Sequence, residues 1–263
     1  KVLCQIDNVE PHEHHLTDKP FNRYYLHSVD GFVYMSEQVH SELRAYSDAP
    51  ALFSPHPLFE NFGERVERSE ACVRLGLDPA NRYVLFFGLI RDYKGLDLLL
   101  DAWAQLRRAG RTEGRRLIVA GEFYTAREPY LNRIADNGLQ DEVLLHDRFI
   151  PDDDVKYYFS AADFVVQPYK TATQSGVTQI AYQFCVPMVV TKVGGLAEIV
   201  PDGRVGYVCE PTPEGVAGAI ERMYEGDTLQ RFRENCVEER RRFSWEEMCS
   251  RITELYGLVA SGK

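Results

Sequence analysis

The sequence predicts an α/β protein built around a doubly wound parallel sheet, and three observations lead to that fold class. From about residue 82 onward, short apolar runs alternate with helical patterns at the spacing of strand–helix–strand units. The run from Val84 to Phe87 is followed by Gly88, where the backbone can turn tightly, and then by an amphipathic helix. The composition, 44% hydrophobic and 27% charged, is that of an ordinary globular protein.

The regular part of the chain contains apolar, β-prone runs of the kind that form strands buried on both faces of a parallel sheet. Strands are predicted at 83–87, 116–120, 142–146, 163–167, 187–191 and 206–208. Helices are predicted near 95–109, 127–137, 152–161, 176–184, 195–200 and 213–225. Two more helices are expected in the tail, one charged over 231–242 and one amphipathic from Trp245 to Leu258.

Residues 1–60 carry a second, smaller set of the same patterns. Strands are predicted at 2–6, 31–35 and 51–53, and helices at 21–27 and 37–46. Because the sequence starts at Lys1 without an initiator Met and a strand is predicted from Val2, the chain is expected to begin in the middle of a domain. The polar, mixed segment 61–80 is interpreted as a linker that ends in a short helix.

Charge and cysteine content exclude several classes of function. The net charge of −10 argues against a nucleic-acid-binding surface, which needs clustered basic charge. The 6 cysteines include no Cys-x-x-Cys pair, so neither a zinc site nor a disulfide framework is expected. No apolar stretch is long enough to cross a membrane and there is no signal peptide, so a cytoplasmic protein is expected.

The loop predicted after the first strand, Asp7 to His15, contains three histidines and several carboxylates. This composition suggests a metal site, but metal ligands are usually held by defined structural elements. A polar active-site loop is therefore the preferred interpretation, and no metal site is predicted.

The segment after the strand at 83–87 has the features of an anion site. Arg91 and Lys94 lie three residues apart in the loop, and Gly95 opens the following helix. A glycine turn, two cations and a helix N-terminus together suit a doubly charged anion such as a diphosphate. From spacing alone, the alternative that both cations are solvated loop charges is equally weighted.

A second anion-binding segment is predicted after the strand at 163–167. The run from Pro168 to Gly176 is rich in small hydroxyl residues and enters the next helix at a glycine. Such a helix start leaves backbone N–H groups open to an anion. The simpler interpretation is that Ser175 caps the helix, and the two are compatible.

Taken in order, several segments of the chain resemble the donor-binding half of the retaining GT-B glycosyltransferases of group 1 (glycosyltransferase family 4-like). They are FFGLIRDYKG, AGEF, DRFIP, AADFVVQPY, TQSG and CVPMVVTKVGGLAEIVPDGRVGYV. The resemblance covers about residues 83–256. Within residues 1–60, DNVEPHEHH and SEQVHSEL resemble the end of that family's N-terminal, acceptor-binding Rossmann-like domain.

The resemblance implies a GT-B type protein with an incomplete N-terminal Rossmann-like domain. Residues 1–60 would be the remnant of the acceptor-binding domain, 61–80 a linker, and 81–243 the nucleotide-sugar-binding domain. Residues 244–263 would form a C-terminal helix that packs towards the N-terminal domain. The chain is thus expected to be part of a longer enzyme, whose missing half would provide any peripheral contact with a membrane, at its inner face.

The resemblance also implies an activity: transfer of a sugar from a nucleoside diphosphate sugar to a glycan or lipid-linked acceptor, with retention and in polysaccharide biosynthesis. No metal or other cofactor is needed in this family. Arg91 and Lys94 would hold the diphosphate as catalytic cations, and Asp7 falls where relatives place a residue near the reacting sugar. A turn or capping role for Asp7 is the alternative.

Further donor-binding residues follow from the same resemblance. Backbone groups of Ser175, Gly176 and Val177 would bind phosphate, and the base would be lined by Arg148, Phe149 and Ile150. The remaining predicted donor-binding residues are Gly88, Thr173, Gln174 and Gln179.

The chain departs from the family at one point. Most relatives carry two glutamates, but a gap-free count places Ala172 and Ile180 at their positions. The contacts to the donor sugar therefore stay open, and Gln179 is the candidate ligand for the ribose.

Two other functions remain open. The chain could bind a nucleotide sugar without activity of its own, because it lacks much of the acceptor domain. It could also be a related GT-B enzyme such as a sugar-nucleotide epimerase, but no convincing acid–base pair is found on the second domain's loops. The sequence identifies neither the base, uridine or guanosine, nor the sugar and its acceptor.

Overall fold

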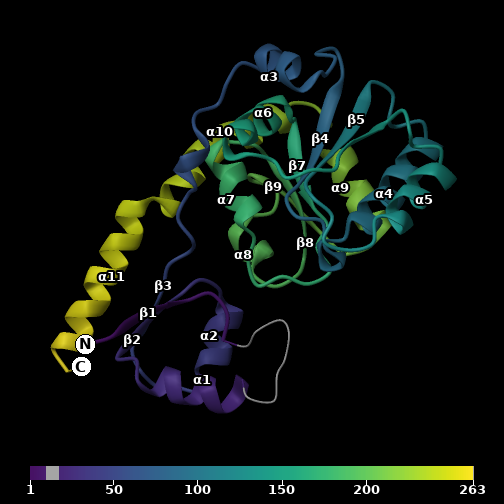
Figure 1. Ribbon diagram of the computed structural model, residues 1–263. Coiled ribbons are helices and arrows are strands. Elements are labelled where there is room, and N and C mark those ends of the chain that lie inside the picture. The colour runs from purple at the N-terminus through teal and green to yellow at the C-terminus, as the bar shows by residue number, and fades with distance from the viewer. Residues whose placement is uncertain (10–17, 263) are drawn as a thin grey trace.

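The computed structural model describes residues 1–9 and 18–262 as two α/β units with a long C-terminal helix (Figure 1). Residues 10–15 of the predicted polar loop, with its three histidines, lie outside the described residues, so the metal hypothesis for that loop is not addressed. Within the described residues, no helix is both long and apolar enough to cross a bilayer.

The larger unit contains a parallel sheet with the strand order β6-β5-β4-β7-β8-β9. Its strands begin and end within one residue of the predicted positions: β4 (Arg82–Phe87), β5 (Arg115–Ala120), β6 (Val143–His146), β7 (Phe164–Gln167), β8 (Met188–Thr191) and β9 (Gly206–Cys209). The strand order reverses between β4 and β7, which pair in parallel with Val84 opposite Phe164. In doubly wound sheets, ligands bind outside the carboxyl ends of the strands at such a switch point.

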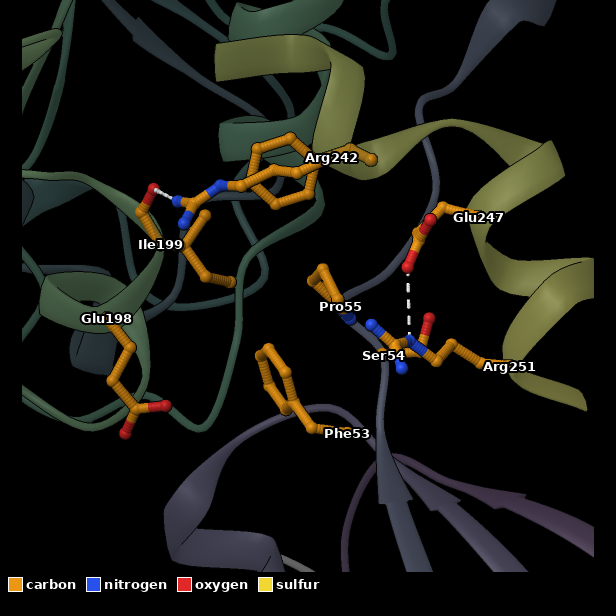
Figure 2. A pocket seen from close by; sticks show the side chains of 9 residues that line it. Phe53, Ser54, Pro55, Glu198, Ile199, Arg242, Glu247 and Arg251 are labelled. Carbon is orange, nitrogen blue, oxygen red and sulfur yellow. Dashed lines mark hydrogen bonds and ion pairs between the residues drawn. The ribbon is translucent and has the colours of Figure 1, made fainter. Parts of the chain in front are cut away.

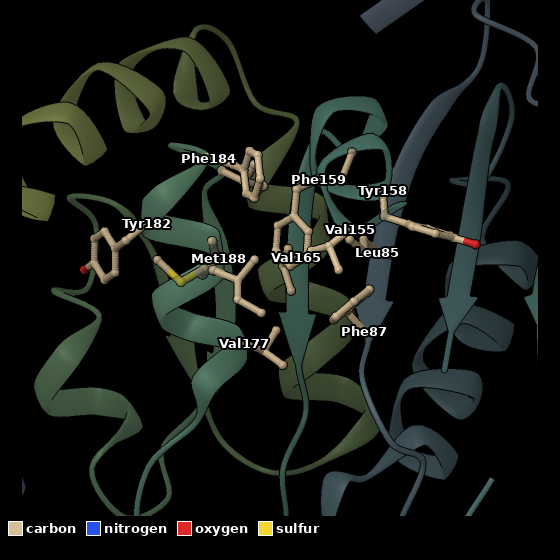
Figure 3. Close-up of a cluster of buried hydrophobic side chains, with 14 of the residues drawn as sticks. Leu85, Phe87, Val155, Tyr158, Phe159, Val165, Val177, Tyr182, Phe184 and Met188 are labelled. Carbon is tan, nitrogen blue, oxygen red and sulfur yellow. The ribbon is translucent and has the colours of Figure 1, made fainter. Parts of the chain in front are cut away.

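Helices cover both faces of this sheet, as the apolar strand runs require. They are α4 (Leu96–Arg108), α5 (Glu128–Asp136), α6 (Asp152–Ala161), α7 (Gly176–Gln183), α8 (Leu196–Ile199) and α9 (Pro213–Met223). Helices α4, α5 and α9 pack on one face around Trp103. On the other face, Phe159 of α6 and Val177 of α7 lie over Leu85, Val165 and Met188 of the sheet (Figure 3).

The smaller unit contains a three-stranded parallel sheet in the order β1-β2-β3. Its elements are β1 (Leu3–Ile6), α1 (Asp18–His27), β2 (Gly31–Tyr34), α2 (Glu37–Leu43) and β3 (Ala51–Phe53). Helix α2 starts where its cap is formed, because the Ser36 hydroxyl accepts a hydrogen bond from the Val39 N–H. It ends three residues before the predicted position 46, in a turn where the Arg44 N–H bonds to the Glu42 and His40 carbonyls.

The segment predicted as a linker contains structured elements. It holds η1 (Glu60–Phe62) and α3 (Arg68–Leu75). Helix α3 packs on α6, and its Ala71 and Cys72 are fully buried in the core of the larger unit. This helix therefore belongs to the packing of the six-stranded sheet.

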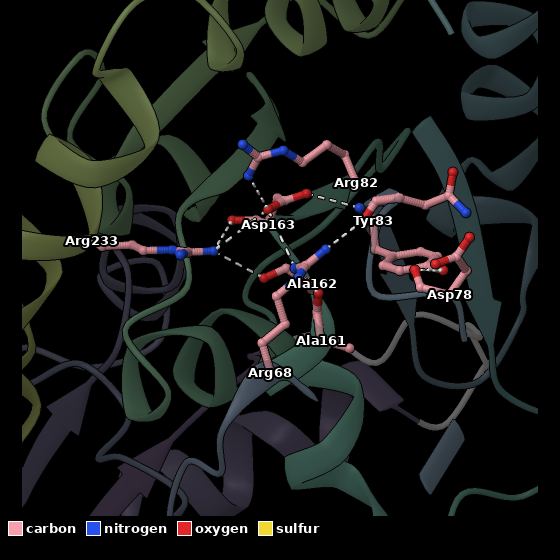
Figure 4. A network of polar contacts seen from close by, with 9 residues as sticks. Arg68, Asp78, Arg82, Tyr83, Ala161, Ala162, Asp163 and Arg233 are labelled. Atoms are coloured by element: carbon pink, nitrogen blue, oxygen red, sulfur yellow. Dashed lines mark hydrogen bonds and ion pairs between the residues drawn. The ribbon is translucent and has the colours of Figure 1, made fainter. Parts of the chain in front are cut away.

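A buried ionic network holds the amino ends of β4 and β7 together (Figure 4). Asp163 has a 1% exposed side chain, and its Oδ2 accepts a 2.8 Å hydrogen bond from the Tyr83 N–H. Arg68, Arg82 and Arg233 surround its Oδ1 at 3.5, 3.2 and 3.9 Å. A buried carboxylate is costly unless it is paired, so the arginines are needed here. Through them the network attaches α3 and α10 to the amino ends of the central strands, away from the carboxyl ends where ligands bind in such sheets.

The tail contains α10 (Thr228–Glu239), η3 (Arg240–Phe243) and α11 (Trp245–Ala260). The charged helix starts three residues earlier than predicted, and its last predicted residues form the 3₁₀ turn η3. Helix α11 leaves the larger unit and packs on β2 and β3 (Figure 1). Met248, Leu255 and Val259 on α11 form one apolar cluster with Val33 and Met35.

Candidate functional site

The candidate site lies at the carboxyl ends of the central strands β4 and β7. Gly88 follows β4 with a φ of +96°, a conformation that favours glycine. Arg91 and Lys94 come next in the loop, in and beside the 3₁₀ turn η2 (Asp92–Lys94). Because β4 and β7 are adjacent and parallel, the loop that follows β7 and leads into α7 lies beside this cationic loop.

The Lys94 ammonium and the first turn of α7 both lie beside the glycine turn at Gly88. A Cβ atom placed on Gly88 would be 3.1 Å from Lys94 Nζ and 3.6 Å from Val177 Cγ2. The structure thus brings together three of the predicted site residues, from two segments almost 90 positions apart in the chain.

The two cations of this loop carry unneutralised charge. Within the described residues, neither Arg91 nor Lys94 has a carboxylate partner; Arg91 lies over Tyr124 and Lys94 over Tyr169, 5.4 and 5.8 Å from the ring centroids. Burial and the nearby Arg91 charge lower the pKa of Lys94 to about 8. An anion bound here would relieve both effects, so the site is electrostatically prepared for one.

The amino end of α7 provides a second component of the site. Ser175 occupies the N-cap position but makes no side-chain cap bond. Instead its hydroxyl lies 3.2 Å from the hydroxyl of buried Tyr169. The helix-capping interpretation of the Ser175 side chain is therefore wrong, and the N–H groups of Gly176 and Val177 have no side-chain cap from this residue.

The loop before α7 is pressed against the glycine pair after β8. The Gly195 N–H donates to the Thr173 carbonyl at 3.2 Å. Gly194 has a φ of +48°, and a Cβ there would be 1.4 Å from the Ala172 carbonyl oxygen. Gly194 is therefore required for close approach of the two loops, which fixes Thr173 and Gln174 beside the start of α7.

Two glutamines of this region have unused hydrogen-bonding groups. Gln179 is 1% exposed, and neither its Nε2 nor its Oε1 has a partner in the part of the chain that the structure describes. The same holds for Nε2 of Gln174. Ile180, at one of the two glutamate positions of the family pattern, lies in the hydrophobic core. The assignment of Gln179 to a ribose therefore stays a prediction.

The predicted base-binding residues lie in the loop that follows the outer strand β6. Strand β5 lies between β6 and β4 in the sheet. Arg148 is exposed and lies 4.0 Å from Asp154, the aromatic side chain of Phe149 is 65% exposed, and Ile150 is buried. They share the carboxyl edge of the sheet with Lys94 but lie two strands away from it.

Asp7 lies on the smaller unit, directly after β1, with an exposed side chain. The carboxyl edge of this sheet faces the loops of the larger unit. The Glu37 N–H donates to Glu198 Oε2 at 3.2 Å, and a Cβ on Gly195 would be 3.1 Å from that of Ser36. Asp7 therefore lies at the carboxyl end of the smaller sheet, which is the end that contacts the larger unit.

A cavity of about 380 Å³ lies where the two units and α11 meet (Figure 2). Phe53 and Pro55 of the smaller unit face Glu198 and Ile199 of the larger one, and Arg251 on α11 pairs with Glu247 at 3.0 Å. The residues that line this cavity include none of the predicted donor-binding residues.

Tyr169 and Lys170 lie within the predicted anion-binding segment from Pro168 to Gly176, but the sequence did not single out either of them as a site residue. Tyr169 contacts Ser175 and Lys94, and Lys170 Nζ lies 2.9 Å from both Asp92 and Asp97. Lys94, Asp92 and Asp97 are more than 70 positions away from these residues in the chain, so no local pattern could reveal their contacts with Tyr169 and Lys170. Among the described residues, no group of three or more His, Cys, Asp and Glu side chains is arranged to hold a metal ion.

Comparison with known proteins identifies the family of this chain. Residues 81–226 match the model of the family "Glycosyl transferases group 1". D-inositol 3-phosphate glycosyltransferase 2 of Catenulispora acidiphila is 31% identical over 245 residues, which cover 87% of this chain and 56% of the relative. A D-inositol 3-phosphate glycosyltransferase of Pseudarthrobacter chlorophenolicus is 31% identical over 144 residues, or 54% of this chain and 34% of the relative.

Solved structures show the same fold at low sequence identity. Sucrose-phosphate synthase from Thermosynechococcus elongatus has a TM-score of 0.81 at 20% identity, covering 99% of this chain and 68% of that one. Anabaena HepE, solved with UDP and glucose, has a TM-score of 0.75 at 17% identity, covering 97% and 71%. The chain spans about half the length of the curated relatives it matches. It has the GT-B fold and belongs to the group 1 glycosyltransferases.

Proposed function

We propose that this chain binds a nucleoside diphosphate sugar, and that the whole protein transfers the sugar to a glycan or lipid-linked acceptor with retention of configuration. One observation carries the proposal: two cations without carboxylate partners in the described residues, Arg91 and Lys94, belong to the loop that meets the first turn of α7. Two positive charges and a helix N-terminus suit the two phosphates of such a donor.

The proposed chemistry follows from this charge distribution. When the bond between the anomeric carbon and the phosphate oxygen breaks, negative charge grows on the departing diphosphate. Arg91, Lys94 and the amino end of α7 would stabilise that charge from more than one side, as preorganised electrostatic catalysis requires. The proposal assigns this role to the protein groups alone, without a metal ion or organic cofactor. Asp7 is the residue of the smaller unit that would lie near the reacting sugar.

The similar proteins suggest which ligands to test first. HepE is described with UDP and with UDP-glucose, which makes a uridine donor the first choice. The relatives named D-inositol 3-phosphate glycosyltransferases make a polyol phosphate an acceptor to test beside glycans and lipid-linked acceptors. If the acceptor is lipid-linked, we propose that the protein acts in polysaccharide biosynthesis in the cytoplasm, at the inner face of a membrane.

The second candidate is binding without transfer. The smaller unit supplies a sheet of only three strands within the described residues, against six in the larger unit. Transfer assays on this chain and on the full-length protein separate the two, because a binding unit without activity would leave the donor unconsumed.

The test of donor binding is a thermal-shift screen of this chain with UDP, GDP, ADP and their glucose esters. A ligand at 100–1,000 times its dissociation constant stabilises the folded state by about 3–4 kcal/mol, which raises the melting temperature by several degrees. Uridine and guanosine are the controls that lack the diphosphate. If no nucleoside diphosphate shifts the melting temperature more than its nucleoside does, the proposed function is contradicted.

A further inference from the structure

The loop that carries Arg91 and Lys94 is held in place by the loop that follows β7. The Lys170 N–H donates to the Tyr93 carbonyl at 2.7 Å. Gly95 has a φ of +67°, and a Cβ there would be 1.9 Å from the Pro168 carbonyl oxygen. The two backbones are thus in contact on both sides of Lys94.

The Lys170 side chain adds two ionic contacts to this backbone contact. Its Nζ lies 2.9 Å from Asp92 Oδ1 and 2.9 Å from Asp97 Oδ2. Asp92 precedes Lys94 in η2, and Asp97 follows it in the first turn of α4. One ammonium group therefore ties down the chain on both sides of Lys94. Burial lowers the pKa of Lys170, but hydrogen bonds to Asp97 and Asp92 outweigh this effect and raise it. The Lys170 ammonium group therefore stays charged at neutral pH.

The residue before Lys170 reaches the other half of the anion site. Tyr169 is buried, its ring lies 5.8 Å from Lys94 Nζ, and its hydroxyl lies 3.2 Å from Ser175 at the start of α7. Residues 168–170 therefore contact both the cationic loop and the helix end that would bind the diphosphate.

We propose that Lys170 is a positioning residue for the donor site: its ion pairs with Asp92 and Asp97 keep the Lys94 ammonium beside Gly88. The ligand in this inference rests on the proposed function, but the positioning itself does not need a nucleotide. Ion pairs as exposed as that with Asp92, whose side chain is 77% exposed, contribute little to stability, so the pairs are better explained by placement of the loop.

A competing explanation is that Lys170 acts by charge alone. Asp92 and Asp97 would repel a diphosphate if no cation neutralised them. The triple variant Lys170→Met, Asp92→Asn, Asp97→Asn separates the explanations, since it removes the repulsion but does not restore the ionic ties.

The first measurement needs no ligand: the titration of Lys94, followed by NMR of the lysine ε-carbons. Lys94 is expected to titrate near 8 in the wild type. In Lys170→Met it should titrate closer to the ordinary lysine value of about 10.4, because the released loop exposes Lys94 to water. Lys170→Arg, which can form both pairs, should preserve the low value, and so should the matched control Lys156→Met on α6, whose ammonium lies over Tyr157. An unchanged Lys94 titration in Lys170→Met would overturn the inference.

The second measurement is UDP binding by calorimetry at pH 7, with circular dichroism to verify the fold. Lys170→Met should weaken binding about tenfold or more, as expected for loss of a well-placed charged contact, and the triple variant should not recover it. Recovery of wild-type affinity in the triple variant would show a pure charge effect and overturn positioning. If Lys170→Met does not fold, Asp97→Asn, which removes one of the two ties, should show the same changes at smaller size, and their absence would count against the inference. Absence of nucleotide binding by the wild type would contradict the proposed function, whereas the Lys94 titration would still test the inference.

Discussion

At the scale of single residues, the site depends on a lysine whose surroundings disfavour its charge. Lys94 is half-buried, lies close to Arg91 and has no carboxylate partner in the described residues. Burial and the like charge lower the pKa of its ammonium to about 8. A fold would gain nothing from such an arrangement, so it is better explained by an anionic ligand that supplies the missing charge.

This charge should make the proposed donor binding depend on pH. Above a pH of about 8 the free chain loses the Lys94 proton, so affinity for UDP should fall, by up to about tenfold per pH unit. Calorimetry between pH 6.5 and 9.5 measures the effect. Lys94→Arg, which stays charged throughout, should remove most of the dependence. An equally steep fall of UDP affinity with pH in Lys94→Arg would show that another group causes the pH dependence.

The same residue should limit the stability of the ligand-free protein. Because the pKa of Lys94 is lower in the folded state, the unfolded chain binds more protons between about pH 8 and 10.5, and stability rises with pH in that window. At pH 7, Lys94→Met should therefore raise the free energy of unfolding by about 1–3 kcal/mol while donor binding is lost. Urea denaturation tests this, and a destabilised Lys94→Met would contradict it.

At the scale of elements, the start of α7 is placed by close contact between loops. The loop from Ala172 to Gln174 lies against Gly194, where a Cβ would overlap the Ala172 carbonyl. Helix α7 itself is packed into the core through Val177 and Ile180. The amino end of the helix is thus held by the core through Val177 and Ile180 and by the contact of the preceding loop with Gly194 and Gly195.

Gly194→Ala should displace this loop. We expect a loss of about 2–4 kcal/mol in stability and at least tenfold weaker UDP binding, because a steric overlap adds to the backbone strain. Gly203→Ala is the matched control: its φ of +72° carries similar strain, but a Cβ there meets nothing within 4 Å. Denaturation and calorimetry on both variants test the idea, and equal effects of the two would refute it.

At the scale of the molecule, α11 joins the two units. It begins directly after η3, which follows α10 of the larger unit, and packs on β2 and β3 of the smaller one. The buried side chains of Leu255 and Val259 lie so close to Gly31 that a Cβ there would be 2.8 Å from Val259 Cγ2. The smaller sheet therefore depends on a helix from the end of the chain.

Leu255→Ala should loosen the smaller unit selectively. Truncating this fully buried side chain should cost about 2–5 kcal/mol, and hydrogen exchange should accelerate in β2 and β3 more than in β4. Ile252→Ala, on the same helix but 39% exposed, is the control and should change little. Equal acceleration in both sheets would mean that the two units unfold as one.

The fold was largely predictable because its strands are continuous apolar runs punctuated by glycine. Strand ends were confirmed within one residue, whereas α2 and α10 differ by three, since helix ends depend on caps and 3₁₀ turns. The cationic loop was predictable from Arg91 and Lys94. The contacts of Lys170 and Tyr169 with this loop were not, because they join two loops brought together only by the pairing of β4 with β7.

The most direct test of the account is UDP binding to Arg91→Ala and Lys94→Ala by calorimetry at pH 7, with uridine as the ligand that lacks phosphate. Charge-assisted contacts are worth about 1.5–3 kcal/mol, so each variant should bind UDP about tenfold or more weakly. Uridine binding should stay as in the wild type, since the nucleoside does not reach these cations. Unchanged UDP affinity in both variants would show that Arg91 and Lys94 are solvated loop charges, and would contradict the donor site proposed for this chain.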